Sequence, residues 1–142
     1  MTIGQTNNNP LNIRKVRGTH WKGEVIKASP SRGGLEGSPF VQFASLEYGI
    51  RAAFCILETY RSKYKATCIE DIISRWAPPA ENDTMAYISS VCFATGIGAR
   101  EELKPTQYGS LIKAMAVIES RMRLSEELIQ KSYELYLKLK RK

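Results

Sequence analysis

SLEYGIRAAFCILETYRSKY, residues 45–64, is the stretch that decides the fold expected from this sequence. Its apolar side chains recur every three or four residues, which is the spacing of one face of an α-helix. Ser45 stands directly before that pattern and can accept a hydrogen bond from a free backbone N–H of the first turn. We therefore expect a helix from Ser45 to about Tyr64, buried along Ile50, Ala53, Phe54, Leu57, Tyr60 and Tyr64.

Capping and breaking residues indicate four further helices after residue 64. Their starting signals are, in order, the capping box Thr67–Glu70, Asp83 or Thr84, Pro105–Thr106 and Ser125. The first of them should end before Pro78–Pro79, the second near Gly96 or Gly98, and the third at about Met122. Leu128, Ser132, Leu135 and Leu139 are spaced along the last.

The chain before Ser45 has a different character. Residues 1–44 hold six of the ten glycines, and they include a glycine-rich loop, SPSRGGLEGSP, at residues 29–39. Three short segments read as extended: Asn12–Val16, Trp21–Ile26 and Phe40–Phe43. We expect one domain over residues 1–142 with an α+β, mostly α-helical fold. In it, a small polar β lobe (1–44) precedes a helical lobe of about five helices (45–142).

Composition is that of an ordinary globular domain, with 43% hydrophobic and 25% charged residues. The sequence lacks the basic and apolar regions of a secretory signal, so we expect synthesis in the cytoplasm. Any action at the cell wall, in the periplasm or in a virion would need delivery by another system. The net charge of +7 indicates an anionic partner such as nucleic acid, an acidic membrane surface or cell-wall polymer. Three widely spaced cysteines and one histidine predict neither a metal site nor a cofactor.

Glu119 is the first candidate for chemistry. It lies four residues after Met115 and seven after Ile112, so it falls on the apolar stripe of the helix that contains them. Burial raises the pKa of a carboxyl group, because an apolar environment penalises the charged form. Such a group is suited to donate a proton near neutral pH. The alternative is a carboxylate at the edge of the stripe that pairs with Arg121 or Arg123.

Two polar stretches could bind a sugar, since an aromatic face beside hydrogen-bonding groups suits a pyranose ring. In WAPPAENDTMAY, residues 76–87, helix capping explains some of the polar groups but not all of them, and the alternative is simply a capped helix that follows a buried tryptophan. In NNNPLNIRKVRGTHWKGE, residues 7–24, the asparagines could equally be turn formers, and Trp21 could be a lid on the core. The candidate sugar-binding residues are Asn9, Asn12, Trp21, Gln42, Trp76, Asn82, Thr84 and Tyr87.

Taken as a set, NNNPLNIR, WKGE, FVQFASLEYGIRA, LETY and IISRWAPPAENDTMAYI resemble a family of small phage and prophage proteins. These are often described as virion structural proteins and are considered lysozyme-like. The resemblance is continuous over about residues 7–98. It implies a lysozyme-like fold and either a role in the virion or an action on cell-wall glycan.

A second resemblance concerns glucosaminidases of the flagellar and autolysin type. In that family a helix ending in an A-x-x-E-S-G-like signature precedes an N-N-x-F-G-I-K segment and a W-x-G. Here NNNPLNIR and HWKG are similar to the last two, while AVIES (116–120) is similar to the first but comes last, as in a circular permutation. This implies that Glu119 is the general acid. The glycine that would follow the acid is absent, because Glu119 is followed by Ser-Arg-Met.

The resulting expectation is a glycosidase that cleaves β-1,4 links of peptidoglycan, whether a muramidase, a glucosaminidase or a lytic transglycosylase. Glu119 would protonate the leaving oxygen, and Glu81 or Glu24 would stabilise the oxocarbenium-like state or position water. The main alternative is a non-catalytic virion or mobile-element protein that binds glycan or a partner protein. Nucleic-acid binding would rest on charge alone, so we expect no nucleic-acid partner.

Overall fold

The computed structural model describes residues 1–26, 39–80 and 82–139 of the chain. Six α-helices follow one another: α1 (Ile3–Thr6), α2 (Leu46–Tyr64), α3 (Ile69–Trp76), α4 (Thr84–Thr95), α5 (Tyr108–Ser120) and α6 (Glu126–Leu139). A 3-10 turn, η2 (Pro105–Gln107), leads into α5. None of the helices in the described ranges is long and apolar enough to cross a membrane.

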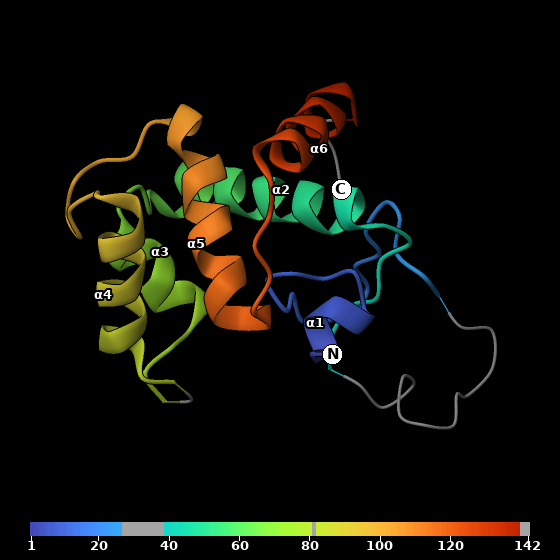
Figure 1. Cartoon of the computed structure of the whole chain (residues 1–142), viewed down its shortest axis with the longest axis horizontal. Coiled ribbons are helices and arrows are strands. Elements are labelled where there is room, and N and C mark those ends of the chain that lie inside the picture. Colours follow the sequence, from blue (N-terminus) through green and yellow to red (C-terminus); the bar gives the residue numbers. More distant parts are fainter. Residues whose placement is uncertain (27–38, 81, 140–142) are drawn as a thin grey trace.

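Helix α2 lies at the centre of the molecule (Figure 1). It contacts α6 along one side and α5 on another, while α3 and α4 pack together and α4 also contacts α5. The main hydrophobic core fills the space among these helices, with Ile50, Leu57, Ile72, Leu111 and Met115 fully buried. The periodicity that predicted these helices is thus the pattern that buries their apolar faces.

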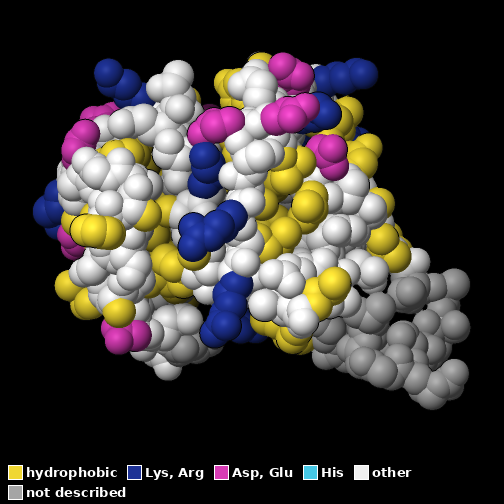
Figure 2. Space-filling model, viewed as in Figure 1, with side chains coloured by type: hydrophobic (Ala, Val, Ile, Leu, Met, Phe, Trp, Pro, Cys, Tyr) yellow, Lys and Arg dark blue, Asp and Glu magenta, His cyan; other side chains and the backbone are white. Residues whose placement is uncertain are grey.

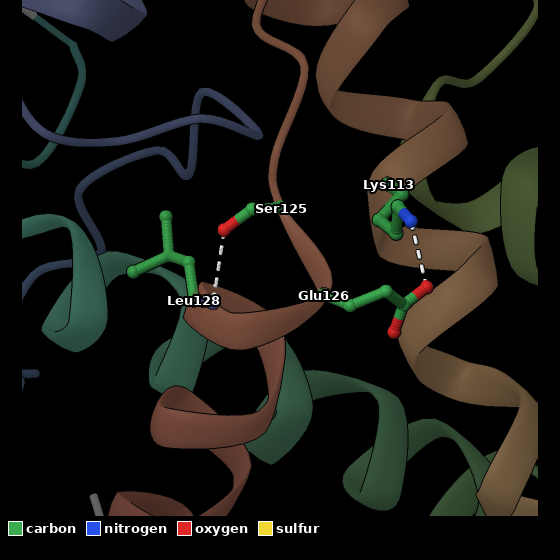
Figure 3. Close-up of polar contacts among 4 residues, drawn as sticks. All are labelled: Lys113, Ser125, Glu126 and Leu128. Carbon is green, nitrogen blue, oxygen red and sulfur yellow. Dashed lines mark hydrogen bonds and ion pairs between the residues drawn. The ribbon is translucent and has the colours of Figure 1, made fainter.

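Most predicted helix ends are confirmed. The Ser45 hydroxyl accepts a hydrogen bond from the Tyr48 N–H at the start of α2, and the Asp83 carboxylate caps α4 in the same way. Gly96 ends α4 in the left-handed conformation. Ser125 caps α6, and the Lys113 ammonium group of α5 contacts the Glu126 carboxylate at 2.7 Å (Figure 3).

Two details of the predicted helices are wrong. The capping box Thr67–Glu70 does not form, because α3 begins at Ile69 after Cys68, which makes no side-chain cap. The Thr67 carbonyl accepts the Leu103 N–H instead, and the Glu70 carboxylate pairs with Arg100 at 3.1 Å. Helix α5 ends at Ser120, two residues earlier than expected, because Arg121 turns into the left-handed region with φ of 56°.

The prediction of a β lobe over residues 1–44 is also wrong, and so is the prediction of an α+β, lysozyme-like architecture. Within residues 1–26 and 39–44 there are no β-strands but only two isolated antiparallel bridges, Arg14 with Phe40 and Glu24 with Phe43. The fold is therefore mostly α. The loop predicted at residues 29–39 lies almost entirely outside the described residues.

The Asn9 side chain explains why strands do not form here. Its amide nitrogen donates to the carbonyls of Ile13 (3.0 Å) and Val41 (2.8 Å), and its oxygen accepts the Ile13 N–H (2.9 Å). The Ile13 carbonyl also accepts the Val41 N–H at 2.9 Å, but Asn9 occupies the Ile13 N–H and the Val41 carbonyl, which would otherwise be available to a strand ladder. Local side-chain bonds of this kind compete with such ladders. Left-handed turns at Asn8 and Asn12 further interrupt the extended backbone.

The N-terminal segment nevertheless packs tightly against the helices. Ile13, Val41 and Phe43 form a second small apolar cluster with Ala52 of α2. Trp76, at the end of α3, packs against both this cluster and the main core. The segment consequently forms a wall that faces the ends of α3 and α5.

Candidate functional site

A cleft of about 750 Å³ lies between the N-terminal segment and the helices. This volume is in the range of ligand pockets in proteins. Three parts of the chain supply most of its lining: the N-terminal segment, one side of α2, and the end of α3 with the turn after it. The described lining residues are Asn12, Ile13, Arg14, Val16, Thr19, Trp21, Phe40, Ile56, Thr59, Tyr60, Arg75, Trp76, Ala77, Pro78, Asn82 and Glu119.

Glu119 is the sole carboxylate among those lining residues. It lies in the last turn of α5 and is half-buried. One carboxylate oxygen accepts a hydrogen bond from the Asn12 amide at 3.1 Å, and the other accepts the Tyr87 hydroxyl at 2.9 Å. No ion pair joins it to Arg121 or Arg123 in the described part of the chain, so it is not the outward, salt-bridged carboxylate of the alternative reading.

The N-terminal segment holds the end of α5 in place. The Asn12 amide also donates to the Glu119 backbone carbonyl at 3.0 Å, and the side chains of Thr2 and Gln5 both donate to the Ser120 carbonyl at 3.0 Å. The Ser120 hydroxyl donates in return to the Pro10 carbonyl. The carbonyls at a helix C-terminus have no partners within the helix, and here side chains from the other end of the chain provide them.

Burial raises the pKa of Glu119 above the ordinary value for glutamate. The hydrogen bonds from Tyr87 and Asn12 and the positive charge of Arg14 lower it, but the effect of desolvation is larger. Burial, together with the adjacent Glu119 carboxylate, also raises the pKa of the Tyr87 hydroxyl. Tyr87 therefore stays protonated and donates a hydrogen bond to Glu119, whose carboxyl group keeps its own proton to higher pH than an exposed glutamate does.

Aromatic rings line the cleft opposite and beside the acid. Trp76 is fixed by a hydrogen bond from its indole N–H to the Leu11 carbonyl (3.3 Å) and by an edge-on contact with Tyr60 at 6.2 Å between ring centroids. Trp21 comes from the N-terminal segment and is also half-buried. Rings of this kind offer apolar faces on which a pyranose ring can stack.

Comparison with known proteins relates the chain to a phage protein. It is 41% identical over 120 residues to Protein P5 of Pseudoalteromonas phage PM2, and the alignment covers 82% of this chain and 70% of the phage protein. The chain belongs to the Protein P5 family. The phage relationship predicted from residues 7–98 is thus confirmed. No protein-family profile matches the sequence.

Within this Protein P5 relative, the cleft brings together five of the predicted site residues. Trp21, Trp76 and Asn82 line it with Asn12 and Glu119. Tyr87, predicted to contact the sugar, is not among the lining residues, and its hydroxyl donates a hydrogen bond to Glu119. Glu81 lies outside the described residues.

The remaining predicted residues have other contacts. Asn9 is fully buried and organises the N-terminal segment. The Thr84 hydroxyl is buried and donates to the Ala77 carbonyl, which fixes the turn between α3 and α4. The Glu24 carboxylate accepts the Trp21 N–H at 2.9 Å within a tight turn. Neither Glu24 nor Gln42 is among the lining residues of the cleft.

Sequence reasoning missed the two arginines of the cleft, Arg14 and Arg75, and the ring of Tyr60 as a lining group. Tyr60 had been assigned to the buried face of α2, where its position is intermediate between core and cleft. Both Arg14 and Arg75 fall within the stretches NNNPLNIR and IISRWAPPAENDTMAYI. Those stretches are therefore informative, but the candidate residues that they supply include neither arginine.

Proposed function

We propose that the protein is a glycosidase that cleaves β-1,4 links of peptidoglycan, with Glu119 as its general acid. The observation that carries the proposal is a half-buried carboxyl group of raised pKa, fixed by two hydrogen bonds and facing a cleft with aromatic walls. A general acid must hold its proton near the pH at which the enzyme works, and burial is the usual means of achieving this.

In the reaction, the Glu119 carboxyl gives its proton to the glycosidic oxygen as the bond from that oxygen to the anomeric carbon breaks. Positive charge then develops at the anomeric carbon and the ring oxygen. The resulting Glu119 carboxylate accepts a proton from the group that attacks the anomeric carbon. Water as that group gives a reducing end, and the sugar's own 6-hydroxyl gives an anhydro sugar.

Two groups could stabilise the positive charge that develops on the sugar: a second carboxylate of the protein, or the substrate itself. Glu24 is engaged with the Trp21 backbone and is not among the lining residues, which leaves Glu81 as the candidate carboxylate from the sequence. The alternative needs no second carboxylate, because the 2-acetamido oxygen of the substrate can itself stabilise the developing charge. Unchanged activity of Glu81→Gln would favour the substrate-assisted route.

Positive charge would help the protein reach its substrate. Figure 2 shows Lys and Arg side chains in a line down the middle of one face, over α5 and the segment that follows it. The basic residues of these two stretches are Lys113, Arg121 and Arg123. Together with the net charge of +7, they favour adsorption to anionic wall polymers, an attraction that salt should weaken.

The test is digestion of purified sacculi followed by mass spectrometry of the soluble products. We expect muropeptides from the wild-type protein and a loss of about a hundredfold or more in their rate of release from Glu119→Gln, since general acid catalysis contributes about 10²–10⁴-fold. The matched control is Glu127→Gln, an exposed glutamate on α6 that pairs with Lys131 and should leave the rate unchanged. Full activity in Glu119→Gln would contradict the proposal.

A second candidate function is binding of cell-wall glycan, or of another virion protein, without cleavage. The observations in its favour are that both Glu119 carboxylate oxygens already accept hydrogen bonds from the protein, and that the related Protein P5 is a phage protein. In that case sacculi would sediment the protein without releasing products. Glu119→Gln would then sediment as the wild type does.

A further inference from the structure

The described lining residues of the cleft carry a positive balance of charge. Among its described lining residues, Arg14 and Arg75 are cations and Glu119 is the single acid. Even when Glu119 is ionised, its single negative charge offsets only one of the two guanidinium groups. Sugar hydroxyls can accept hydrogen bonds from a guanidinium group, but only an anionic group also neutralises its charge, so the cleft is better matched to an anionic ligand.

Arg75 is the better placed of the two to contact a ligand. Its guanidinium carbon lies 3.5 Å from the centroid of the Tyr64 ring and 5.6 Å from that of Tyr60. Within the described ranges of the chain it has no ion-pair or hydrogen-bond partner. Stacking on a ring uses the face of the guanidinium and leaves the N–H groups at its edge free to bind a carboxylate through two parallel bonds.

The aromatic network fixes Arg75 relative to the sugar-stacking wall. Tyr60 contacts Arg75 on one side and the edge of Trp76 on the other, and both Tyr60 and Trp76 line the cleft. An arginine held in this way loses less side-chain entropy on binding than a free one. Arg14 is held differently, over the Phe40 ring at 5.2 Å, and lies near enough to Glu119 to lower the pKa of that acid.

We propose that Arg75 binds a carboxylate of the ligand, so that the cleft selects glycan strands bearing acidic substituents over neutral ones. In peptidoglycan these substituents are the carboxylates of the peptide stems. Chitin, which has the same β-1,4 backbone of amino sugars, carries none. This inference rests on the proposed function for the identity of the glycan, but its charge requirement can be tested separately from cleavage.

The experiment measures equilibrium binding through the fluorescence of Trp21 and Trp76, with the Glu119→Gln variant so that the ligand stays intact. The probes are a disaccharide tetrapeptide, the same compound with its carboxylates converted to amides, chitotetraose, and a dT tetramer. We expect the acidic muropeptide to bind about tenfold or more tightly than its amide and than chitotetraose, since hydrogen bonds between charged groups are the strong ones. We expect the dT tetramer to bind more weakly than the muropeptide.

Substitutions test whether Arg75 causes this selectivity. In the Glu119→Gln background, Arg75→Gln should remove the preference for the acidic ligand and leave chitotetraose binding unchanged, and Arg75→Lys should retain part of the preference. The matched control is Arg100→Gln, an exposed arginine that pairs with Glu70 and is not a lining residue. Equal binding of the acid and amide probes, or an unchanged preference in Arg75→Gln, would overturn the inference, and tighter binding of the dT tetramer would replace it with nucleic-acid recognition.

The outcomes for the two proposals are separable. Charge-selective binding by a protein that releases no products from sacculi would support the role of Arg75 and contradict the glycosidase. Release of products with equal affinity for the acid and amide probes would support the glycosidase and contradict the role of Arg75.

Discussion

At the scale of single residues, two opposing effects determine the pKa of Glu119. Burial favours its protonated form, while the hydrogen bonds from Tyr87 and Asn12 favour the charged form. The sequence could predict the first effect, because Glu119 falls on an apolar stripe. It could not predict the second, because Asn12 is 107 positions away and Tyr87 is 32 positions away along the chain.

Replacing Tyr87 with phenylalanine should raise the pKa of Glu119 further. The Tyr87 hydroxyl stabilises the ionised carboxylate and so lowers its pKa. When this hydrogen bond is lost, less remains to counter the rise in pKa that burial causes. The carboxyl chemical shift of Glu119, followed by NMR as a function of pH, should titrate at a higher pH in Tyr87→Phe than in the wild type. If the protein cleaves glycan, the alkaline limb of its pH–rate profile should move in the same direction.

Tyr108→Phe is the control for this measurement, since its hydroxyl accepts a hydrogen bond from Arg61 and does not contact Glu119. A titration of Glu119 that moved to lower pH in Tyr87→Phe would contradict the assigned hydrogen bond.

At the scale of elements, the helices were predictable and the N-terminal segment was not. The capping residues Ser45, Asp83 and Ser125 each accept a hydrogen bond from a backbone N–H three positions away, so local sequence contains the whole signal. The end of α5 depends instead on Asn12, Thr2 and Gln5, which lie more than a hundred positions away. The extended pattern of residues 12–16 predicts a strand, but the Asn9 side chain takes up the Ile13 N–H, and only the backbone bonds to Pro39 and Val41 remain across the segment.

Asn9→Ala tests this account of the N-terminal segment. The substitution leaves the Val41 carbonyl and the Ile13 N–H without their partner in a buried region, and each such group costs about 1–3 kcal/mol. The Ile13 carbonyl keeps the hydrogen bond that it accepts from the Val41 N–H. We expect the free energy of unfolding to fall by about 2 kcal/mol or more, as measured by urea denaturation.

Asn82→Ala is the matched control for Asn9→Ala, because Asn82 is exposed and makes a single hydrogen bond to the Pro78 carbonyl. It should change the free energy of unfolding by no more than about 0.5 kcal/mol. Equal effects of the two substitutions would show that Asn9 does not organise the segment.

At the scale of the whole molecule, the most unusual feature of the interior is Arg51 of α2. Its side chain is fully buried, and none of its three guanidinium nitrogens has a hydrogen-bond partner in the described part of the chain. A buried charge without a partner is costly, because its hydration is lost and nothing replaces it. The position reads as an ordinary exposed helix residue in the sequence, and no local signal indicates its burial.

Arg51→Met should therefore stabilise the protein. Methionine is flexible enough to fill the space of the arginine stem, and it removes the uncompensated charge. We expect the free energy of unfolding to rise by about 1 kcal/mol or more, measured by thermal and urea unfolding. A loss of stability would mean that the guanidinium group has a favourable contact that outweighs its desolvation.

Arg61→Met provides the contrast on the same helix. The Arg61 guanidinium donates to the Tyr108 hydroxyl at 2.9 Å and to the Leu103 carbonyl, and so ties α2 to the start of α5. Its replacement should lower the free energy of unfolding by about 1 kcal/mol or more, since it removes bonds from a charged donor.

The long separation between Asn12 and Glu119 has a consequence for synthesis of the protein. Ribosomes add about 5–20 residues per second, so the asparagine leaves the ribosome several seconds before the acid that it will bind. During that interval the N-terminal segment has no α5 on which to close, and bringing such distant residues together is slow compared with forming a helix. The arrangement around Glu119 is thus completed only after translation has passed residue 120, and a truncated nascent chain would carry the aromatic wall of the cleft without its acid.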